Sequence, residues 1–275
     1  CVETIKSVKS CFGFLRKNNI YSQVCLELLK EGIITLNQID IEFQTFDMYH
    51  EVVKKGVFET IPKSVLTPDV AGAFELCLEA VKINGLNLKH IPTSLLDIKT
   101  VSGVGTLCLE AVKQNYKAYQ HILDDFFESY SDEGFEIYKI LAVKDPSKIP
   151  EIVYNPNNTG FTITQEQNSE LWTLVITTNP TFVNKIPKET ENILGLYEIA
   201  IQSSKEAILR LIPEEYKSEE LCRKAVEKDI RNIPAIPKPL FSTIITRDYI
   251  LKNPYAIEYI DTDYPGYDEL CLECV

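Results

Sequence analysis

The sequence predicts an all-α fold, a right-handed helical-repeat solenoid of about ten two-helix units of 24–34 residues. The first observation behind this prediction is a segment that occurs three times almost unchanged, at 75–82, 106–113 and 269–275. The second is one spacing of apolar residues that recurs along the whole chain. The third is a later apolar pair in each unit, which proline closes in several of them.

The first helix of each unit is predicted from the apolar spacing around the cysteine of that segment, which we number position 0. Apolar residues at −1, 0, +3 and +4 form one stripe along an α-helix of about 3.6 residues per turn. The pattern recurs with position 0 at residues 1, 25, 49, 77, 108, 138, 172, 197, 222, 247 and 271. Successive spacings are 24, 24, 28, 31, 30, 34, 25, 25, 25 and 24, so the middle of the chain is stretched.

A shorter second helix follows in each unit. A turn residue near +8 punctuates the first helix, for example Gly32, Gly85 or Pro180. An apolar residue near +14 anchors the second helix, and a following proline ends it, because the residue before proline disfavours the α region. The residues at +14 are Leu15, Ile39, Ile91, Ile122, Ile186, Leu211 and Ile236. Because helices this short are marginal alone, stacked units are expected to bury a shared core.

The best-preserved repeat residues are 75–82 and 106–113, with the following Asn84-Gly85, Leu88 and Ile91-Pro92. They resemble the repeat family catalogued as domain of unknown function 4116, whose units carry the pattern E-L-C-L-x-A-V-K-x-N-G. Its members occur in amoeba-infecting giant viruses and in some bacteria and protists. The units at Cys222 and Cys271 also match well, and the others match in apolar spacing alone. The resemblance implies a helical repeat protein, but no activity and no catalytic residues, because the family has none assigned.

Composition and charge exclude several classes of function. The chain has 275 residues, of which 45% are hydrophobic and 25% charged, so it has the composition of a globular protein. Its 28 basic and 40 acidic residues give a net charge of −12. We expect no nucleic-acid binding, because phosphate contacts need dense basic residues. We expect no membrane span, because no run of about 18 apolar residues occurs.

Six of the eight cysteines are interpreted as core residues rather than disulfide partners or metal ligands. Cys1, Cys25, Cys77, Cys108, Cys222 and Cys271 all occupy position 0, where other units place Tyr or Trp. Free Cys behaves as a small buried hydrophobe at such a position. Cys271 and Cys274 form a C-x-x-C pair, but no second pair has the spacing of a zinc site. Many unpaired cysteines favour a reducing compartment, so we expect a cytoplasmic protein, in a viral or host-cell cytoplasm.

The three histidines are interpreted as structural. His50-Glu51 begins a pattern close to the zincin motif, but the fifth residue is Lys54 and not His. His90 and His121 both lie at +13, so the register of the repeat explains their placement better than a metal pair does.

Two loop patterns imitate ligand-binding motifs. Gly103-Val-Gly105 lacks the third glycine and the preceding strand of a phosphate-binding loop, and is interpreted as an inter-unit loop. The segment from Asp261 to Gly266 imitates the start of an EF-hand, but Leu272 stands where the bidentate Glu is needed. We therefore assign no cofactor, no metal and no catalytic residue, and the sequence does not identify the binding residues.

The stretched middle of the array suggests the domain organisation. We expect N-terminal repeats over 1–154, an irregular connecting loop over 155–168, and regular C-terminal repeats over 169–275. Insertions in repeats often fall on the binding face, and three occur here: Pro92–Thr106, Asp124–Glu136 and Pro150–Ser169. The second insertion mixes acidic and aromatic residues. It is either a helix with one buried face or an acidic surface for a basic partner.

The function expected from the sequence is that of a non-enzymatic helical-repeat scaffold, which binds a protein partner that the sequence does not identify. One alternative is a structural component of a larger, viral assembly. A second alternative is an enzyme with an acidic groove. Its carboxylates would come from Asp124, Asp125 and Glu128, or from Asp261 and Asp263. Oligomeric state and the binding face are not fixed by the sequence.

Overall fold

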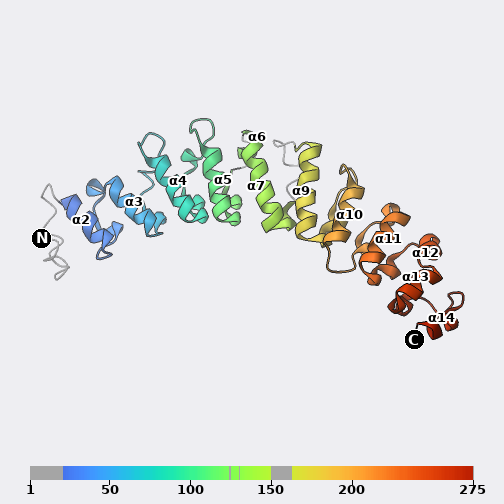
Figure 1. Ribbon diagram of the computed structural model, residues 1–275. Coiled ribbons are helices and arrows are strands. Elements are labelled where there is room, and N and C mark those ends of the chain that lie inside the picture. Colours follow the sequence, from blue (N-terminus) through green and yellow to red (C-terminus); the bar gives the residue numbers. More distant parts are fainter. Residues whose placement is uncertain (1–20, 124, 130, 150–162, 275) are drawn as a thin grey trace. The chain divides into compact units, whose positions relative to one another are not determined.

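The computed structural model describes residues 21–123, 125–129, 131–149 and 163–274. In these ranges the regular secondary structure consists of α-helices and 3₁₀-helices, with no strand, so the all-α prediction is confirmed. Figure 1 shows the helices in chain order, from α2 in blue to α14 in red. The chain divides into two compact parts, 1–140 and 141–275, which we call the N-terminal and C-terminal halves.

In the N-terminal half, each of the helices α2 to α5 is followed by one or two 3₁₀-helices. The elements are α2 (Tyr21–Lys30), η2 (Leu36–Gln38), η3 (Ile41–Phe43), α3 (Phe46–Lys54), η4 (Phe58–Thr60), α4 (Ala73–Ile83), η5 (Gly85–His90), η6 (Thr93–Leu95), α5 (Val104–Gln114), η7 (Tyr116–His121) and α6 (Phe126–Ser129). Helix α7 (Ser131–Lys144) crosses the boundary between the halves. Successive first helices pack together, α2 on α3, α3 on α4 and α4 on α5, and η5 packs on η7 (Figure 1).

The C-terminal half repeats the same alternation. Its elements are η8 (Pro146–Lys148), α9 (Gln165–Thr178), η9 (Pro180–Lys185), α10 (Ile193–Ser203), η10 (Leu209–Leu211), η11 (Glu214–Tyr216), α11 (Glu219–Lys228), η12 (Ile230–Ala235), α12 (Lys238–Ile244), α13 (Arg247–Lys252), η13 (Pro254–Tyr259) and α14 (Tyr267–Glu273). Helix α10 packs on both α9 and α11, and α13 packs on α14. The second helices also meet, since η12 packs on η13.

The predicted apolar stripe is the core of both halves. The position-0 residues from 25 to 222 are at most 3% exposed, whether they are Cys, Tyr or Trp. Burial raises the pKa of the Cys77 and Cys108 thiols to about 12. A buried thiol cannot ionise easily in apolar surroundings, which agrees with a structural role. The interpretation of these cysteines as core residues is therefore confirmed for Cys25, Cys77, Cys108 and Cys222.

The turn residue that follows the first helix lies at position +7, and it is glycine in the first two described units. Gly32 and Gly56 adopt φ of +74° and +76°. The Gly32 N–H donates to the Leu29 carbonyl at 3.0 Å, and the Ile33 N–H donates to the Leu28 carbonyl at 2.9 Å. This pair of bonds is a Schellman motif, which requires a left-handed residue that glycine supplies without a Cβ clash.

Several later units place Asn or Asp at position +7 instead. Their side chains accept a hydrogen bond from the backbone N–H two residues ahead, which starts the 3₁₀-helix directly. The pairs are Leu86 N–H to Asn84 (3.1 Å), Lys117 N–H to Asn115 (3.1 Å), Thr181 N–H to Asn179 (3.2 Å) and Arg231 N–H to Asp229 (3.0 Å). The turn residue therefore lies at +7 and not near +8 as the sequence suggested.

Gly85 illustrates this correction. It stands at +8 and is the first residue of η5, with ordinary negative φ. A Cβ on Gly85 would lie 2.1 Å from the carbonyl oxygen of Ala111 in α5. Its N–H also donates to the Gln114 Oε1 at 2.5 Å. Glycine is needed here because the backbone of the next unit approaches too closely for any side chain.

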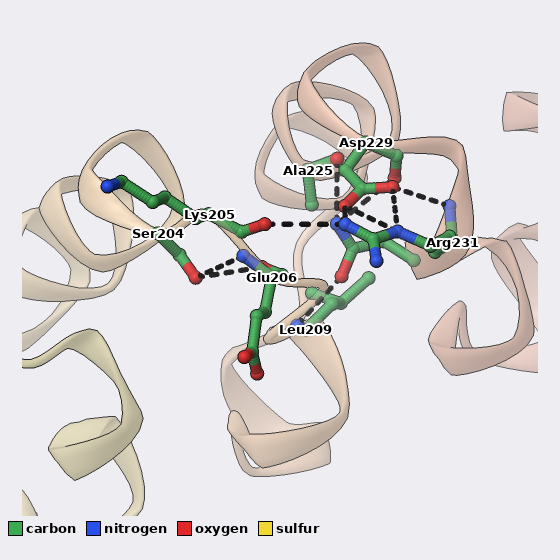
Figure 2. Close-up of polar contacts among 8 residues, drawn as sticks. Ser204, Lys205, Glu206, Leu209, Ala225, Asp229 and Arg231 are labelled. Atoms are coloured by element: carbon green, nitrogen blue, oxygen red, sulfur yellow. Dashed lines mark hydrogen bonds and ion pairs between the residues drawn. The ribbon is translucent and has the colours of Figure 1, made fainter.

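A buried asparagine joins two neighbouring units in the C-terminal half. Asn232 is 3% exposed, and its Nδ2 donates to the carbonyls of Ala225 at 2.9 Å and Asp229 at 3.1 Å. Its Oδ1 accepts from the Leu209 N–H of the preceding unit at 3.0 Å. Figure 2 shows these partners, with Arg231 reaching from the same turn to the Lys205 carbonyl. All the polar atoms of this buried amide side chain have found partners, as burial demands.

Side chains at position +6 reach back to the preceding unit. They donate to carbonyls at the C-terminal end of its first helix, which lack partners inside the helix. The pairs are Lys55 with the Leu29 and Lys30 carbonyls, Gln114 with the Ile83 carbonyl (3.1 Å) and Lys228 with the Gln202 carbonyl (3.0 Å). Each of these helix ends is thus completed by the next unit along the chain.

The predicted register of the unit at 247 is wrong by one residue. Arg247 and Leu251, expected on the buried stripe, are exposed, whereas Ile245 and Ile250 are fully buried. Position 0 of this unit is Thr246, the N-cap of α13. Three consecutive bulky residues, 249–251, made both registers fit the sequence pattern.

The ion pairs support this correction. With Thr246 at position 0, Arg247 stands at +1, and its side chain pairs with Glu273 at +2 of the following unit. Glu198 and Lys224 occupy the same two positions and pair at 3.0 Å. The same pair of positions therefore bridges neighbouring units twice in this half.

Two other boundaries also differ from the prediction. Leu211 is partly exposed, and Ile212, which precedes Pro213, is the buried residue, because this unit holds one extra residue before its second helix. Residues 165–168, predicted as loop, are the first turn of α9, where Thr164 and Gln167 form a capping box. The rest of that loop up to 162 lies outside the described residues. The two halves meet at 140/141, before the predicted loop.

Replacing Cys77 with Asp should lower the free energy of unfolding by at least about 3 kcal/mol, because it buries an unpaired carboxylate. Urea denaturation followed by circular dichroism measures the change. Cys274→Asp is the control, since that side chain is partly exposed and tolerates a charge. Equal stability of the two variants would show that the register of the N-terminal half is wrong.

Replacing Asn232 with Ala should cost about 1–3 kcal/mol, because the Leu209 N–H and the Ala225 carbonyl lose a partner inside the core. Asn184→Ala is the matched control on an exposed position and should change stability by less than about 0.5 kcal/mol. Thermal and urea unfolding of both variants provide the comparison. A neutral Asn232→Ala would mean that this amide does not link the two units in solution.

Candidate functional site

The described surface of the C-terminal half carries a groove alongside η12, α12 and η13, which we call the C-terminal groove. Its volume is about 580 Å³. It is lined by Ile233, Pro234, Ile236, Lys238, Phe241, Ser242, Tyr259, Ile260, Asp261, Asp263, Tyr264 and Pro265. The volume lies in the range of ligand sites, about 300–1,000 Å³.

The apolar lining of the groove comes from the ends of two successive second helices. Ile233 lies in η12, and Ile236 and Ile260 are the C-caps of η12 and η13. These three side chains are at most 7% exposed, because the repeat places them on its second apolar stripe. The groove therefore opens directly over the shared core of two units.

The polar lining comes from the two linkers that follow these helices. The first linker forms α12, with Lys238 and Phe241, and the second is the turn that carries Asp261 and Asp263. A backbone bond from the Tyr264 N–H to the Asp261 carbonyl closes this turn at 3.0 Å. The Tyr264 hydroxyl donates to the Ile245 carbonyl at 3.1 Å, which fastens the turn to the end of α12.

An earlier pair of linkers in the same half is closed. There Lys188 and Glu215 form an ion pair at 2.8 Å. Their hydrogen bond and opposite charges raise the pKa of Lys188 and lower the pKa of the Glu215 carboxyl. Lys188 is the second residue of its linker and Glu215 the third of the next. Lys238 and Asp263 occupy the same two places, yet no ion pair joins them in the part of the chain that the structure describes.

The structure brings together one of the two acidic sets that the sequence singled out. Asp261 and Asp263 line the C-terminal groove. In the other set, Asp124 and the side chain of Glu128 lie outside the described residues, and Asp125 is exposed. Sequence reasoning missed Lys238 and the aromatic residues of the groove. The repeat position that Lys238 shares with Lys188 is the signal that could have found it.

The predicted insertions contribute less than expected. The first one lines part of a smaller hollow of about 320 Å³ that involves residues 68–75 and 95–102. In the second, Phe126 and Phe135 are buried, and the Phe127 ring stacks on the Tyr138 ring with centroids 5.0 Å apart. The described aromatic residues thus face the core, which favours the interpretation as helices with one buried face. Most of the third insertion lies outside the described residues.

The histidines take part in contacts between units. His50 Nδ1 lies 2.5 Å from the Glu79 Oε2 of the next unit. His90 and His121 both lie at the ends of second helices, η5 and η7, which pack together. Burial, with a smaller contribution from nearby Lys89, lowers the pKa of His90. In the part of the chain that the structure describes, no group of three or more His, Cys, Asp or Glu side chains has the arrangement of a metal site.

Glycine and cysteine motifs also find structural places. Gly103 is the N-cap of α5 with φ of +86°, and Gly105 is buried in the first turn of that helix, so only Gly103 belongs to the inter-unit loop. Cys271 on α14 is partly exposed, so its interpretation as a core residue is wrong, and Cys274 at the C-cap of that helix is partly exposed as well. They line a hollow of about 520 Å³ with Tyr255, which is 74% exposed.

Comparison with known proteins adds one finding. Residues 74–127 match the family described as Domain of unknown function (DUF4116). The resemblance seen in the repeat residues is thereby confirmed over this stretch, which runs from α4 into α6. No curated protein and no solved structure matches the chain. Among the described helices, none combines the length and the apolar character that crossing a membrane requires.

Alkylation of the native protein should modify Cys271 and Cys274 at least about tenfold faster than Cys77 and Cys108, because the latter thiols are buried and hard to ionise. Pulsed iodoacetamide labelling with peptide mass spectrometry resolves each site. In urea the four sites should react at similar rates, which controls for peptide detection. Fast labelling of Cys77 in the native protein would contradict its place in the core.

Proposed function

We propose that the chain is a non-enzymatic helical-repeat scaffold that binds another protein. The observation that carries the proposal is the C-terminal groove, where an apolar lining and charges of both signs lie open at the surface. Protein recognition sites commonly combine an apolar centre with a polar rim. The groove belongs to the repeat itself, since its residues come from equivalent positions of successive units.

The proposal includes a right-handed solenoid of about ten two-helix units. The proposal is supported by the way neighbouring units pack within each half. First helices pack on first helices, and second helices pack on second helices. The same capping at +7 and the same reach-back at +6 recur along the chain. Solenoids built in this way present long continuous surfaces suited to protein partners. The free cysteines support a reducing, cytoplasmic location as part of the same proposal.

An acidic-groove enzyme is the less favoured candidate. Asp261 and Asp263 line the C-terminal groove, but both residues are exposed to solvent. Lys238 is the basic residue in the same lining. General acid–base catalysis by carboxylates normally depends on burial that separates their pKa values.

A structural component of a larger assembly differs from the scaffold in stoichiometry, since it would contact many copies of itself.

Affinity purification of the full chain from its own cells, with chemical cross-linking and a high-salt wash, tests the scaffold proposal. We expect one protein retained in a fixed ratio, with cross-links to the C-terminal half. The Cys222→Asp variant serves as bait with the core of the C-terminal half disrupted and should lose that protein. Recovery of further copies of the chain alone would overturn the scaffold in favour of an assembly component. Equal retention by both baits would also overturn it.

A further inference from the structure

We infer that the C-terminal groove binds a peptide segment in which an apolar side chain stands between a basic and an acidic residue. This inference rests on the proposed scaffold function and names the site and the partner chemistry. It starts from the comparison of two junctions of the same repeat. Lys188 and Glu215 close one junction, whereas Lys238 and Asp263 leave the other open.

The linkers that carry the two lysines differ in structure. The linker after η9, which carries Lys188, is a turn in which the Thr190 N–H donates to the Pro187 carbonyl at 3.0 Å. The linker after η12, which carries Lys238, forms the longer helix α12 instead. The extra helical turn carries Phe241 and Ser242 into the lining of the groove.

The groove is held open by bonds from outside it. Arg223 Nη2 donates to the Thr243 carbonyl at 2.7 Å, which ties the end of α12 to α11. Lys217 Nζ donates to the Ala235 carbonyl at 3.1 Å, at the end of η12. The Tyr264 hydroxyl fastens the second linker to Ile245. A site whose sides are fixed in this way loses little conformational entropy on binding.

The lining defines the chemistry of the occupant. Phe241 and Tyr259 are partly exposed in the lining and offer an apolar surface that a Leu, Ile or aromatic side chain can cover. Asp261 and Asp263 on one linker suit a Lys or Arg, and Lys238 on the other suits a carboxylate. The net charge of −12 also attracts basic segments over longer distances. A peptide satisfies these three demands at once, because its side chains carry both charges and an apolar group on one backbone.

Fluorescence anisotropy with a labelled synthetic peptide tests the inference. The probe places Leu-Phe between a Lys and a Glu, in a Gly-Ser context. We expect saturable binding to the full chain. Replacing Leu-Phe by Ser-Ser in the peptide should abolish binding, and this change cannot affect the folding of the protein. No saturable binding of the first peptide, or equal binding of the two peptides, would overturn the inference.

A double-mutant cycle locates the contact. The double substitution Asp261→Asn and Asp263→Asn should weaken binding of the Lys peptide about fivefold, the scale of an exposed ion pair. It should leave unchanged the affinity of a peptide with norleucine in place of Lys. Lys238→Gln should weaken binding of the same probe about as much, because Lys238 faces the Glu of the peptide. Lys188→Gln and Glu215→Gln at the closed junction are the matched controls and should have no effect. Absence of coupling between Asp261/Asp263 and the peptide Lys overturns the inference.

The same variants separate this inference from the scaffold function. If the partner retained by the wild-type chain is retained equally by the Asp261→Asn/Asp263→Asn chain, the scaffold stands and the groove assignment falls. If the peptide cycle shows the expected coupling and no protein is retained from cells, the groove chemistry stands and the scaffold function falls.

Discussion

The structure depends on how each first helix is ended at position +7. The residue there must stop the α-helix after about ten residues and send the chain into a second helix that covers the same core. Gly32 does this through a left-handed conformation, and Asn84 does it through a side-chain bond to the Leu86 N–H. The two solutions differ chemically but lead to the same succession of helices. Once this turn is fixed, the stripes at 0 and +14 fall on one side and can share a core.

The periodic part of this fold could be predicted from sequence because burial follows the helical period. Cys77, Trp172 and Cys222 were placed in the core by spacing alone, and each is fully buried. Spacing failed where one residue is added or where several bulky residues adjoin. Leu211 and Arg247 were therefore misplaced by one position, and only packing against the neighbouring unit decides between the registers. Position +7 is hard to recognise in every unit, because Gly, Asn and Asp share a function there and not a chemical character.

The groove could be predicted only in part. The sequence identifies Asp261 and Asp263 as a pair of carboxylates that can meet in one groove, and both line it. Lys238 lies 25 residues before Asp263 and resembles an ordinary exposed lysine. Whether such a pair closes, as Lys188 and Glu215 do, depends on the length of the helix between the units. That length follows from tertiary contacts of α12, such as the bond from Arg223 to the Thr243 carbonyl, which a sequence pattern does not contain.

The reach-back side chains at position +6 give the array a direction. Lys228 completes the end of α10, and Gln114 completes the end of α4, but among the described residues no first helix is completed in this way by the unit that precedes it. When the array is treated as a one-dimensional chain of coupled units, each interface with a reach-back bond has the donor on its C-terminal side and the acceptor on its N-terminal side. Loss of a unit leaves helix-end carbonyls of its predecessor without their side-chain donors, and it leaves side chains of its successor, such as Lys224 and Asn232, without their partners. Where a +6 side chain reaches back, as Lys55, Gln114 and Lys228 do, the opening of a unit therefore uncovers the end of the first helix on its N-terminal side.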